Sequence, residues 1–205
     1  MAKKAVLLTV IAACLVALVF ISFSGEDHTA PPALPEPDAT QQMASSQGLP
    51  EGHPSVGGQE KSEAPDFTLD SLDGDKVTLS DLRGKAVVMN FWSSTCGPCI
   101  IEMPSFEKLA KLMEGKPFQI ITVTSDTRKM AQNTAEGLNM TVPVLLDHEG
   151  KVAMQYGVYF TPETVIIDPS GNLDQKITGA ANWGDASVVK YLDSLIEKSK
   201  TQKEG

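Results

Sequence analysis

The chain has 205 residues, 41% of them hydrophobic, and a formal net charge of −9 at pH 7. This length fits one folded domain of about 100 to 200 residues with tails, so a repeat protein or a two-domain enzyme is not expected. With 26 acidic and 17 basic residues, the chain lacks the basic surface that attracts phosphate backbones, which excludes nucleic acid as the expected partner. Three cysteines are too few for a disulfide framework, so we expect sulfur to act chemically at one or two positions.

Residues 1–24 have the pattern of an export segment. A short basic start precedes an uncharged apolar run over residues 5–23, which is long enough to span a bilayer core of about 30 Å. The basic end would stay in the cytoplasm and everything after the run would be exported. Three interpretations stay open: an uncleaved anchor in the bacterial inner membrane, which we favour, a cleaved signal peptide, or lipidation at Cys14. All three place the rest of the chain outside the cytoplasm, in the periplasm.

Residues 25–62 are expected to form a disordered linker. They contain no aromatic residue and six prolines, so they cannot bury enough apolar surface to offset the entropy of ordering. His28 and His53 lie in this stretch, where isolated histidines are usually solvated rather than metal ligands. The short run Glu51–Pro54 has no assigned role beyond that of a spacer.

Residues 63–200 are predicted to form the folded domain, followed by a polar tail over 201–205. Asp73-Gly74 separates two alternating stretches and is a strong hairpin signal. The apolar run over 86–92 is typical of a central strand covered on both faces. Strands are predicted at 67–69, 76–79, 86–92, 118–123, 142–146, 164–167 and 173–178. Helices are predicted at 99–113, 130–138 and 186–198, with a further brief helix that ends at 157. This order predicts an α/β sandwich around a mixed sheet.

Two cysteines stand where the first long strand meets its helix, in the run Cys96-Gly97-Pro98-Cys99. The unpaired N–H groups and the dipole at a helix N-terminus stabilise a thiolate, which lowers a thiol pKa from about 8.5 toward neutrality. Two intervening residues let the sulfurs meet in a small ring. We therefore predict that Cys96 attacks a disulfide and that Cys99 resolves the mixed disulfide.

Two other interpretations of the cysteine pair are weaker. A zinc site needs two further ligands, and beyond the cysteines the folded part offers only His148 as a histidine. A purely structural disulfide that closes so short a loop constrains little chain entropy. No metal or other cofactor is therefore expected beyond a redox-active disulfide between Cys96 and Cys99.

Pro162 precedes a predicted buried strand, where proline suits a strand edge or a cis peptide bond. A cis proline that faces the cysteine pair would leave the preceding backbone free to pair with an extended substrate. The simpler alternative is that Pro162 only starts the strand.

Taken together, these motifs resemble the thioredoxin-fold thiol–disulfide oxidoreductases of the TlpA/ResA-like group. The similarity runs from Ala64 through the last helix and rests on Asn90-Phe91-Trp92, Cys96-Gly97-Pro98-Cys99, Glu102-Met103-Pro104 and Thr161-Pro162. The resemblance implies a thioredoxin fold with an N-terminal β-hairpin and an extra helix-containing insertion over 124–157. It also implies that Trp92, Thr161 and Pro162 contact the substrate.

The same resemblance implies a function. Members of the group reduce protein disulfides in the periplasm, commonly in apocytochrome c before haem attachment. Their electrons come from a membrane thiol carrier of the CcdA or DsbD type. The family therefore favours a reductant, although an exported compartment tends to oxidise and the residues themselves do not fix the direction.

The chain departs from the family pattern at two positions. Thr95 replaces the tryptophan that usually precedes the first cysteine, which removes an apolar wall beside the nucleophile. Asn90 stands where thioredoxin carries a buried acid for proton transfer, and an amide cannot titrate. Glu102 is the candidate to replace that acid if it is partly buried, since burial would raise its pKa. The alternative places Glu102 in solvent on the first turn of the helix.

Two other functions are alternatives to disulfide reduction. A peroxiredoxin-like thiol peroxidase shares the Ala64-Pro65-Asp66-Phe67 opening and would use Cys96, but it expects threonine where this chain has Ser93. A non-enzymatic thioredoxin-like adaptor would hold unfolded clients without turnover.

Overall fold

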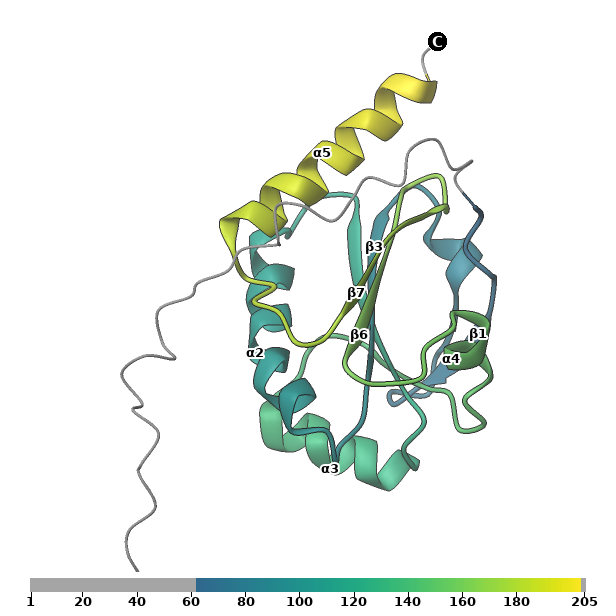
Figure 1. The fold of residues 1–205 in the computed structure, drawn as a ribbon, viewed down its shortest axis with the longest axis vertical. Helices are drawn as coiled ribbons and strands as arrows, with labels where there is room; N and C mark the ends of the chain where they lie inside the picture. The colour runs from purple at the N-terminus through teal and green to yellow at the C-terminus, as the bar shows by residue number, and fades with distance from the viewer. Residues whose placement is uncertain (1–61, 204–205) are drawn as a thin grey trace, which may run out of the picture. The chain divides into compact units, whose positions relative to one another are not determined.

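The computed structural model describes residues 62–203 (Figure 1). The strands are β1 (Thr68–Ser71), β2 (Lys76–Thr78), β3 (Ala86–Trp92), β4 (Phe118–Thr124), β5 (Val144–Leu146), β6 (Glu163–Ile167) and β7 (Leu173–Thr178). The helices are η1 (Leu79–Leu82, 3-10), α2 (Gly97–Leu112), α3 (Arg128–Leu138), α4 (Lys151–Gln155) and α5 (Ala186–Lys203). None of the helices in this range is long and apolar enough to cross a membrane. The predicted export segment over residues 1–24, together with Cys14, His28 and His53, lies outside the described residues.

All seven strands form one mixed sheet in the order β2-β1-β5-β4-β3-β6-β7. β3, β4 and β5 run parallel to one another, whereas β6 is antiparallel to β3 and the β1–β2 hairpin is antiparallel to β5. The expected α/β sandwich with an N-terminal hairpin is therefore confirmed. The three parallel strands end at the same edge of the sheet, and the loops that follow them meet there.

Helices cover both faces of the sheet, and Figure 1 shows α2 and α5 on one side with α4 on the other. Alternate residues of β3 point to opposite faces because side chains alternate along a strand. Val88 and Trp92 pack against α2 and α5, and Met89 and Phe91 pack against α4 and η1. β3 is buried along its whole length, as the apolar run predicted.

Several element boundaries differ by one or more residues from those predicted from sequence, and three of these differences have a direct physical reason. β5 begins at Val144 rather than residue 142, because Pro143 before it has no N–H to donate. α2 begins at Gly97 rather than Cys99, with Pro98 in its first turn, where a missing N–H does no harm. α5 continues to Lys203 rather than ending at residue 198. The prediction followed the apolar stripe, whose last buried residue is Ile196, whereas the helix continues beyond that stripe.

Candidate active site

The two cysteines lie at the N-terminus of α2 and are joined by a disulfide. Their Sγ atoms are 2.05 Å apart and their Cα atoms 5.3 Å apart. Cys96 is the N-cap residue, and its Sγ accepts a hydrogen bond of 3.3 Å from the backbone N–H of Cys99. An N–H directed at this sulfur would also stabilise a thiolate on it once the disulfide is reduced.

The two sulfur-bearing residues differ in their access to solvent. Cys96 is half-buried, whereas Cys99 is completely buried against the core between α2 and the sheet. A substrate disulfide can therefore approach Cys96 from solvent, but it cannot reach Cys99 directly. After reduction, the arrangement offers one accessible thiol and a second one close enough to attack it.

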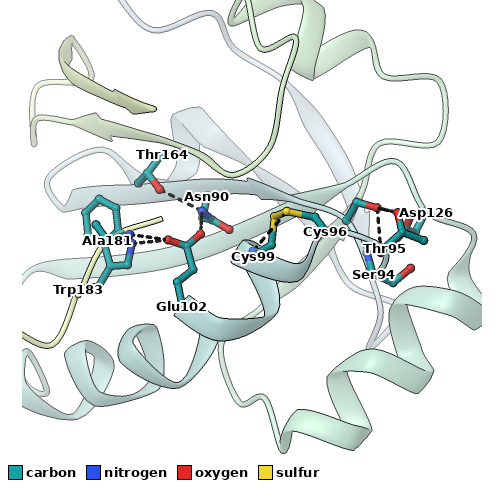
Figure 2. The surroundings of a disulfide bond; sticks show 11 residues. Asn90, Ser94, Thr95, Cys96, Cys99, Glu102, Asp126, Thr164, Ala181 and Trp183 are labelled. Carbon is teal, nitrogen blue, oxygen red and sulfur yellow. Dashed lines mark hydrogen bonds between the residues drawn. A yellow bond between two sulfur atoms is a disulfide. The ribbon is translucent and has the colours of Figure 1, made fainter. Parts of the chain in front are cut away.

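The loop that leads to Cys96 is held by Asp126 (Figure 2). The Oδ2 of Asp126 accepts a hydrogen bond of 2.6 Å from the backbone N–H of Ser94, and its Oδ1 accepts one of 3.3 Å from Ser93 Oγ. Asp126 follows β4, which pairs with β3 up to the register Trp92–Thr124. The two loops are therefore neighbours because their parallel strands are. Sequence reasoning missed Asp126, and its position two residues after a buried parallel strand was the available signal.

Glu102 lies one turn past Cys99 and is buried, with 3% of its surface exposed. The solvent-facing alternative for this residue is therefore wrong. Its Oε1 accepts a hydrogen bond from Asn90 Nδ2 at 3.0 Å, and its Oε2 accepts bonds from Trp183 Nε1 at 3.1 Å and from the Ala181 N–H at 3.2 Å. Figure 2 shows these donors gathered around the carboxyl group.

Burial raises the pKa of Glu102, because a charged carboxylate is costly away from water. The hydrogen bonds from Trp183, Ala181 and Asn90 act in the opposite direction but do not cancel the effect of burial. Sequence reasoning found the carboxyl group but not Trp183 or Ala181. These donors come from the segment after β7, about 80 residues further along the chain.

Asn90 links Glu102 to the sheet. Its Nδ2 also donates to Thr164 Oγ1 on the neighbouring strand β6 at 3.0 Å. Its Oδ1 is buried and has no hydrogen-bond partner among the described residues. A buried amide oxygen without a partner is uncommon, and here it lies on the residue that contacts the buried acid.

The Thr161–Pro162 peptide bond is cis. β6 starts at the next residue, and the β3–β6 register pairs Phe91 with Glu163, so Pro162 lies beside the end of β3. The Pro162 carbonyl accepts a bond from the Gly179 N–H at 2.9 Å, whereas the exposed Thr161 makes no backbone hydrogen bond within residues 62–203. The backbone of Thr161 is thus available to pair with an extended chain.

The remaining predicted residues make no hydrogen bond to the cysteines or to Glu102 among the described residues. Trp92 is only 1% exposed, and its Nε1 has no hydrogen-bond partner among the described residues, so it belongs to the core under the site. Thr95 is exposed and its Oγ1 is 3.1 Å from Ser93 Oγ. His148 is exposed, and within residues 62–203 no group of three or more His, Cys, Asp or Glu side chains is placed to hold a metal ion.

This fold, with a Cys-X-X-Cys disulfide at the start of its first long helix, defines a thioredoxin-fold thiol–disulfide oxidoreductase. The chain belongs to the AhpC/TSA family, whose model matches residues 61–176. It is 35% identical over 135 residues to the thiol-disulfide oxidoreductase ResA of Geobacillus thermodenitrificans, covering 65% of this chain and 76% of that one. It is 39% identical over 119 residues to the thioredoxin-like protein YneN of Bacillus subtilis, covering 57% and 69%. The resemblance inferred from the motifs is thereby confirmed.

Solved structures agree with this assignment. A protein from Chlorobium tepidum assigned as the thiol:disulfide interchange protein DsbE matches with a TM-score of 0.62 and 27% identity, over 67% of this chain and 98% of that one. The exposed lipoprotein thioredoxin Etrx1 of Streptococcus pneumoniae matches with a TM-score of 0.57 and 30% identity, over 63% and 99%.

Proposed function

We propose that this oxidoreductase is exported, tethered to the membrane, and reduces disulfides of protein substrates through Cys96 and Cys99. The observation that carries the proposal is the pairing of a half-buried Cys96 with a fully buried Cys99 at the start of α2. Because of this difference in exposure, the two sulfurs act in different steps. The accessible Cys96 thiolate attacks the client, and the buried Cys99 thiolate attacks only Cys96.

The reaction starts from the dithiol. The Cys96 thiolate attacks one sulfur of the client disulfide, which forms a Cys96–client bond and releases the other client sulfur as a thiolate. Cys99 then loses its proton and attacks Cys96 Sγ, which releases the second client thiol and forms the disulfide seen here. Two electrons pass to the client, and a reduced membrane thiol carrier of the CcdA or DsbD type returns the protein to the dithiol.

Glu102 is the proposed proton acceptor for Cys99. Burial raises the pKa of its carboxyl group, and it lies three residues beyond Cys99 on the same helix. A carboxyl group with a raised pKa exchanges protons closer to neutral pH than an ordinary one. The backbone of Thr161 beside Pro162 is the proposed pairing edge for the client chain, and Trp92 lines the same cavity as Thr161.

The location and the clients are inferred from the sequence and from relatives. The basic start and apolar run over residues 5–23 support export and anchoring in the inner membrane. The structural relative Etrx1 is itself described as an exposed lipoprotein. Apocytochrome c is the client that the TlpA/ResA-like group suggests, because its two haem-attachment cysteines must be reduced before haem is joined to them.

Trapping the mixed disulfide tests this function. The Cys99→Ala variant cannot perform the second step, so it should accumulate covalent complexes through Cys96 that are released by dithiothreitol. The matched Cys96→Ala variant should form none. An adaptor would keep its function in both variants, and rapid consumption of hydrogen peroxide by the wild type would instead support a thiol peroxidase.

The reduction potential tests the direction. A reductant should equilibrate with glutathione buffers near the value of about −270 mV known for thioredoxin. A value near that of DsbA, about −120 mV, would show that the protein donates disulfides rather than removing them.

A further inference from the structure

A cavity lies beside the active site, on the face of the sheet that carries α4. Its volume is about 450 Å³, within the range of roughly 300 to 1,000 Å³ typical of ligand pockets. Ser93, three residues before Cys96, and Thr161, next to Pro162, both line it. A client chain that reaches the sulfur and pairs beside Pro162 therefore passes this cavity.

Asp147 is the charged residue in the lining. It follows β5 directly and is buried, with 4% of its surface exposed. Its Oδ2 accepts a hydrogen bond of 2.9 Å from the Ala153 N–H, whereas its Oδ1 accepts none from the described residues. Among the described residues, this Oδ1 is not one of the side-chain oxygens sealed from solvent, so it is accessible to a cationic donor that enters the cavity, and the carboxylate charge would stabilise that donor there.

The structural role of Asp147 uses only one of its two carboxylate oxygens. Oδ2 accepts the hydrogen bond from the Ala153 N–H, which fixes the turn that leads into α4. The nearest lysine along the chain, Lys151, forms its ion pair with Glu149, and 71% of the lysine side chain is exposed, so it acts on Asp147 only through its charge. The second oxygen of Asp147 is therefore left without a hydrogen-bond donor in the described part of the chain.

The rest of the lining suits a long side chain with a charged end. Phe91, Val123 and Val158 give buried apolar walls, against which methylene groups can pack. Tyr159 and Phe160 are each 79% exposed and form an aromatic rim, where a passing cation is attracted to the ring faces. An apolar wall, an aromatic rim and a buried carboxylate together match lysine or arginine.

We propose that this cavity is a side-chain subsite that takes a lysine or arginine of the client polypeptide, close in sequence to the cysteine under attack, with Asp147 as its counterion. The inference rests on the proposed function, because it needs a client chain bound beside Pro162. It gives the enzyme a preference among disulfides that the sulfur chemistry alone would not supply. Clients with a basic residue at the matching distance from the cysteine are reduced faster.

Peptide substrates test the subsite on the reduced full chain in detergent. Each peptide carries one cysteine in a mixed disulfide with thionitrobenzoate, and attack by Cys96 on the peptide sulfur releases the coloured thiolate. Arginine, lysine, norleucine or glutamate is placed in turn at each of the three positions on either side of the cysteine. At one position we expect kcat/KM to be about tenfold higher for arginine or lysine than for norleucine, and lowest for glutamate.

Variants then assign the preference to one carboxylate. Asp147→Asn keeps an oxygen for the Ala153 N–H but removes the charge, so the basic and norleucine peptides should react within about twofold of each other. The control Glu149→Gln neutralises an exposed acid two residues away and should keep the full preference. If Asp147→Asn does not fold, the double variant Tyr159→Ala, Phe160→Ala at the exposed rim should lower the preference instead.

Three results would overturn the subsite: equal rates for basic and norleucine peptides at every position, a preference that survives Asp147→Asn, or equal loss of the preference in Glu149→Gln. In each of these cases the peptides are still reduced, so the proposed function stands. Failure to reduce any of the peptides, with insulin also left intact, would instead overturn the proposed function itself.

Discussion

Trp183 Nε1 donates a hydrogen bond of 3.1 Å to Glu102 Oε2, which joins the segment after β7 to the helix that carries the cysteines. The indole is fully buried and stacks on Phe106 of α2, with ring centroids 5.0 Å apart. The donor therefore has little freedom to move away from the carboxyl group. This geometry places a buried acid at a fixed position behind the disulfide and makes its protonation testable in two ways.

The first prediction concerns stability against pH. The pKa of Glu102 is raised by burial in the folded protein, so the folded state holds this proton to a higher pH than the unfolded state. The stability that the protonated Glu102 carboxyl contributes is thus full below about pH 4 and is lost as the pH rises through the raised pKa. Glutamine does not titrate, so the unfolding free energy of Glu102→Gln should increase relative to that of wild type as the pH rises over this interval. Urea unfolding from about pH 4.5 to about pH 7.5 measures this difference, and parallel curves for the two proteins would contradict it.

The second prediction concerns the rate of exchange. If Glu102 accepts the Cys99 proton, Glu102→Gln should slow release of the client from the mixed disulfide by about 100-fold, at the lower end of general-base effects. Stopped-flow fluorescence of that step across pH measures it. The wild-type profile should show an ionisation that the variant lacks.

Trp183→Phe serves as the comparison for this second experiment. It keeps the carboxyl group but removes a hydrogen bond that lowers its pKa, so the ionisation in the rate profile should move to higher pH. A purely structural role for Glu102 predicts slower exchange with no change in the shape of either profile.

Much of this site could be predicted from local sequence. The Cys-X-X-Cys pair, the buried strand before it and Pro162 each carry a short-range signal; the structure has the disulfide at the start of α2, β3 buried along its length, and a cis peptide bond before Pro162. The start of α2 was missed by two residues because cysteine is not among the usual N-cap residues, so Cys96 gave no capping signal.

The partners of the site residues could not be predicted in the same way. Glu102 meets Trp183, 81 residues away, and Asn90 meets Thr164, 74 residues away. Such contacts depend on which strands become neighbours and on how the segment after β7 returns to α2. Asp126 and Asp147 show the same limit: each follows a strand that ends at the active-site edge, but only the order β5-β4-β3 shows that these ends are adjacent.

The third prediction concerns Asp126 and the loop before Cys96. Asp126→Ala leaves the Ser94 N–H and Ser93 Oγ without their acceptor, so the loop should loosen and the unfolding free energy should fall by about 1 kcal/mol. Hydrogen exchange at the Ser94 amide should accelerate in this variant. Asp126→Asn keeps an acceptor and should stay close to wild type. Unchanged Ser94 protection in the alanine variant would show that the bond does not hold the loop.

The fourth prediction concerns the hydrogen bond from Asn90 to Glu102. Asn90→Asp places a second carboxyl group about where Nδ2 now lies, 3.0 Å from Glu102 Oε1. Two carboxylates at that distance cannot both be charged, so their shared proton is held to a higher pH in the folded state. The variant should lose about 3 kcal/mol of stability at neutral pH and recover part of it at about pH 5, because the folded pair binds a proton that the unfolded chain has already lost.

A double variant decides whether this loss comes from the pair itself. In Asn90→Asp, Glu102→Gln the amide and the carboxyl group exchange places. The amide introduced at position 102 can donate to the carboxylate introduced at position 90, while the amide oxygen accepts from Trp183. The cycle of single and double variants, measured by urea unfolding at about pH 7, should therefore show a coupling of about 2 kcal/mol in favour of the double variant. Additive losses would mean that Asn90 acts through Thr164 rather than through Glu102.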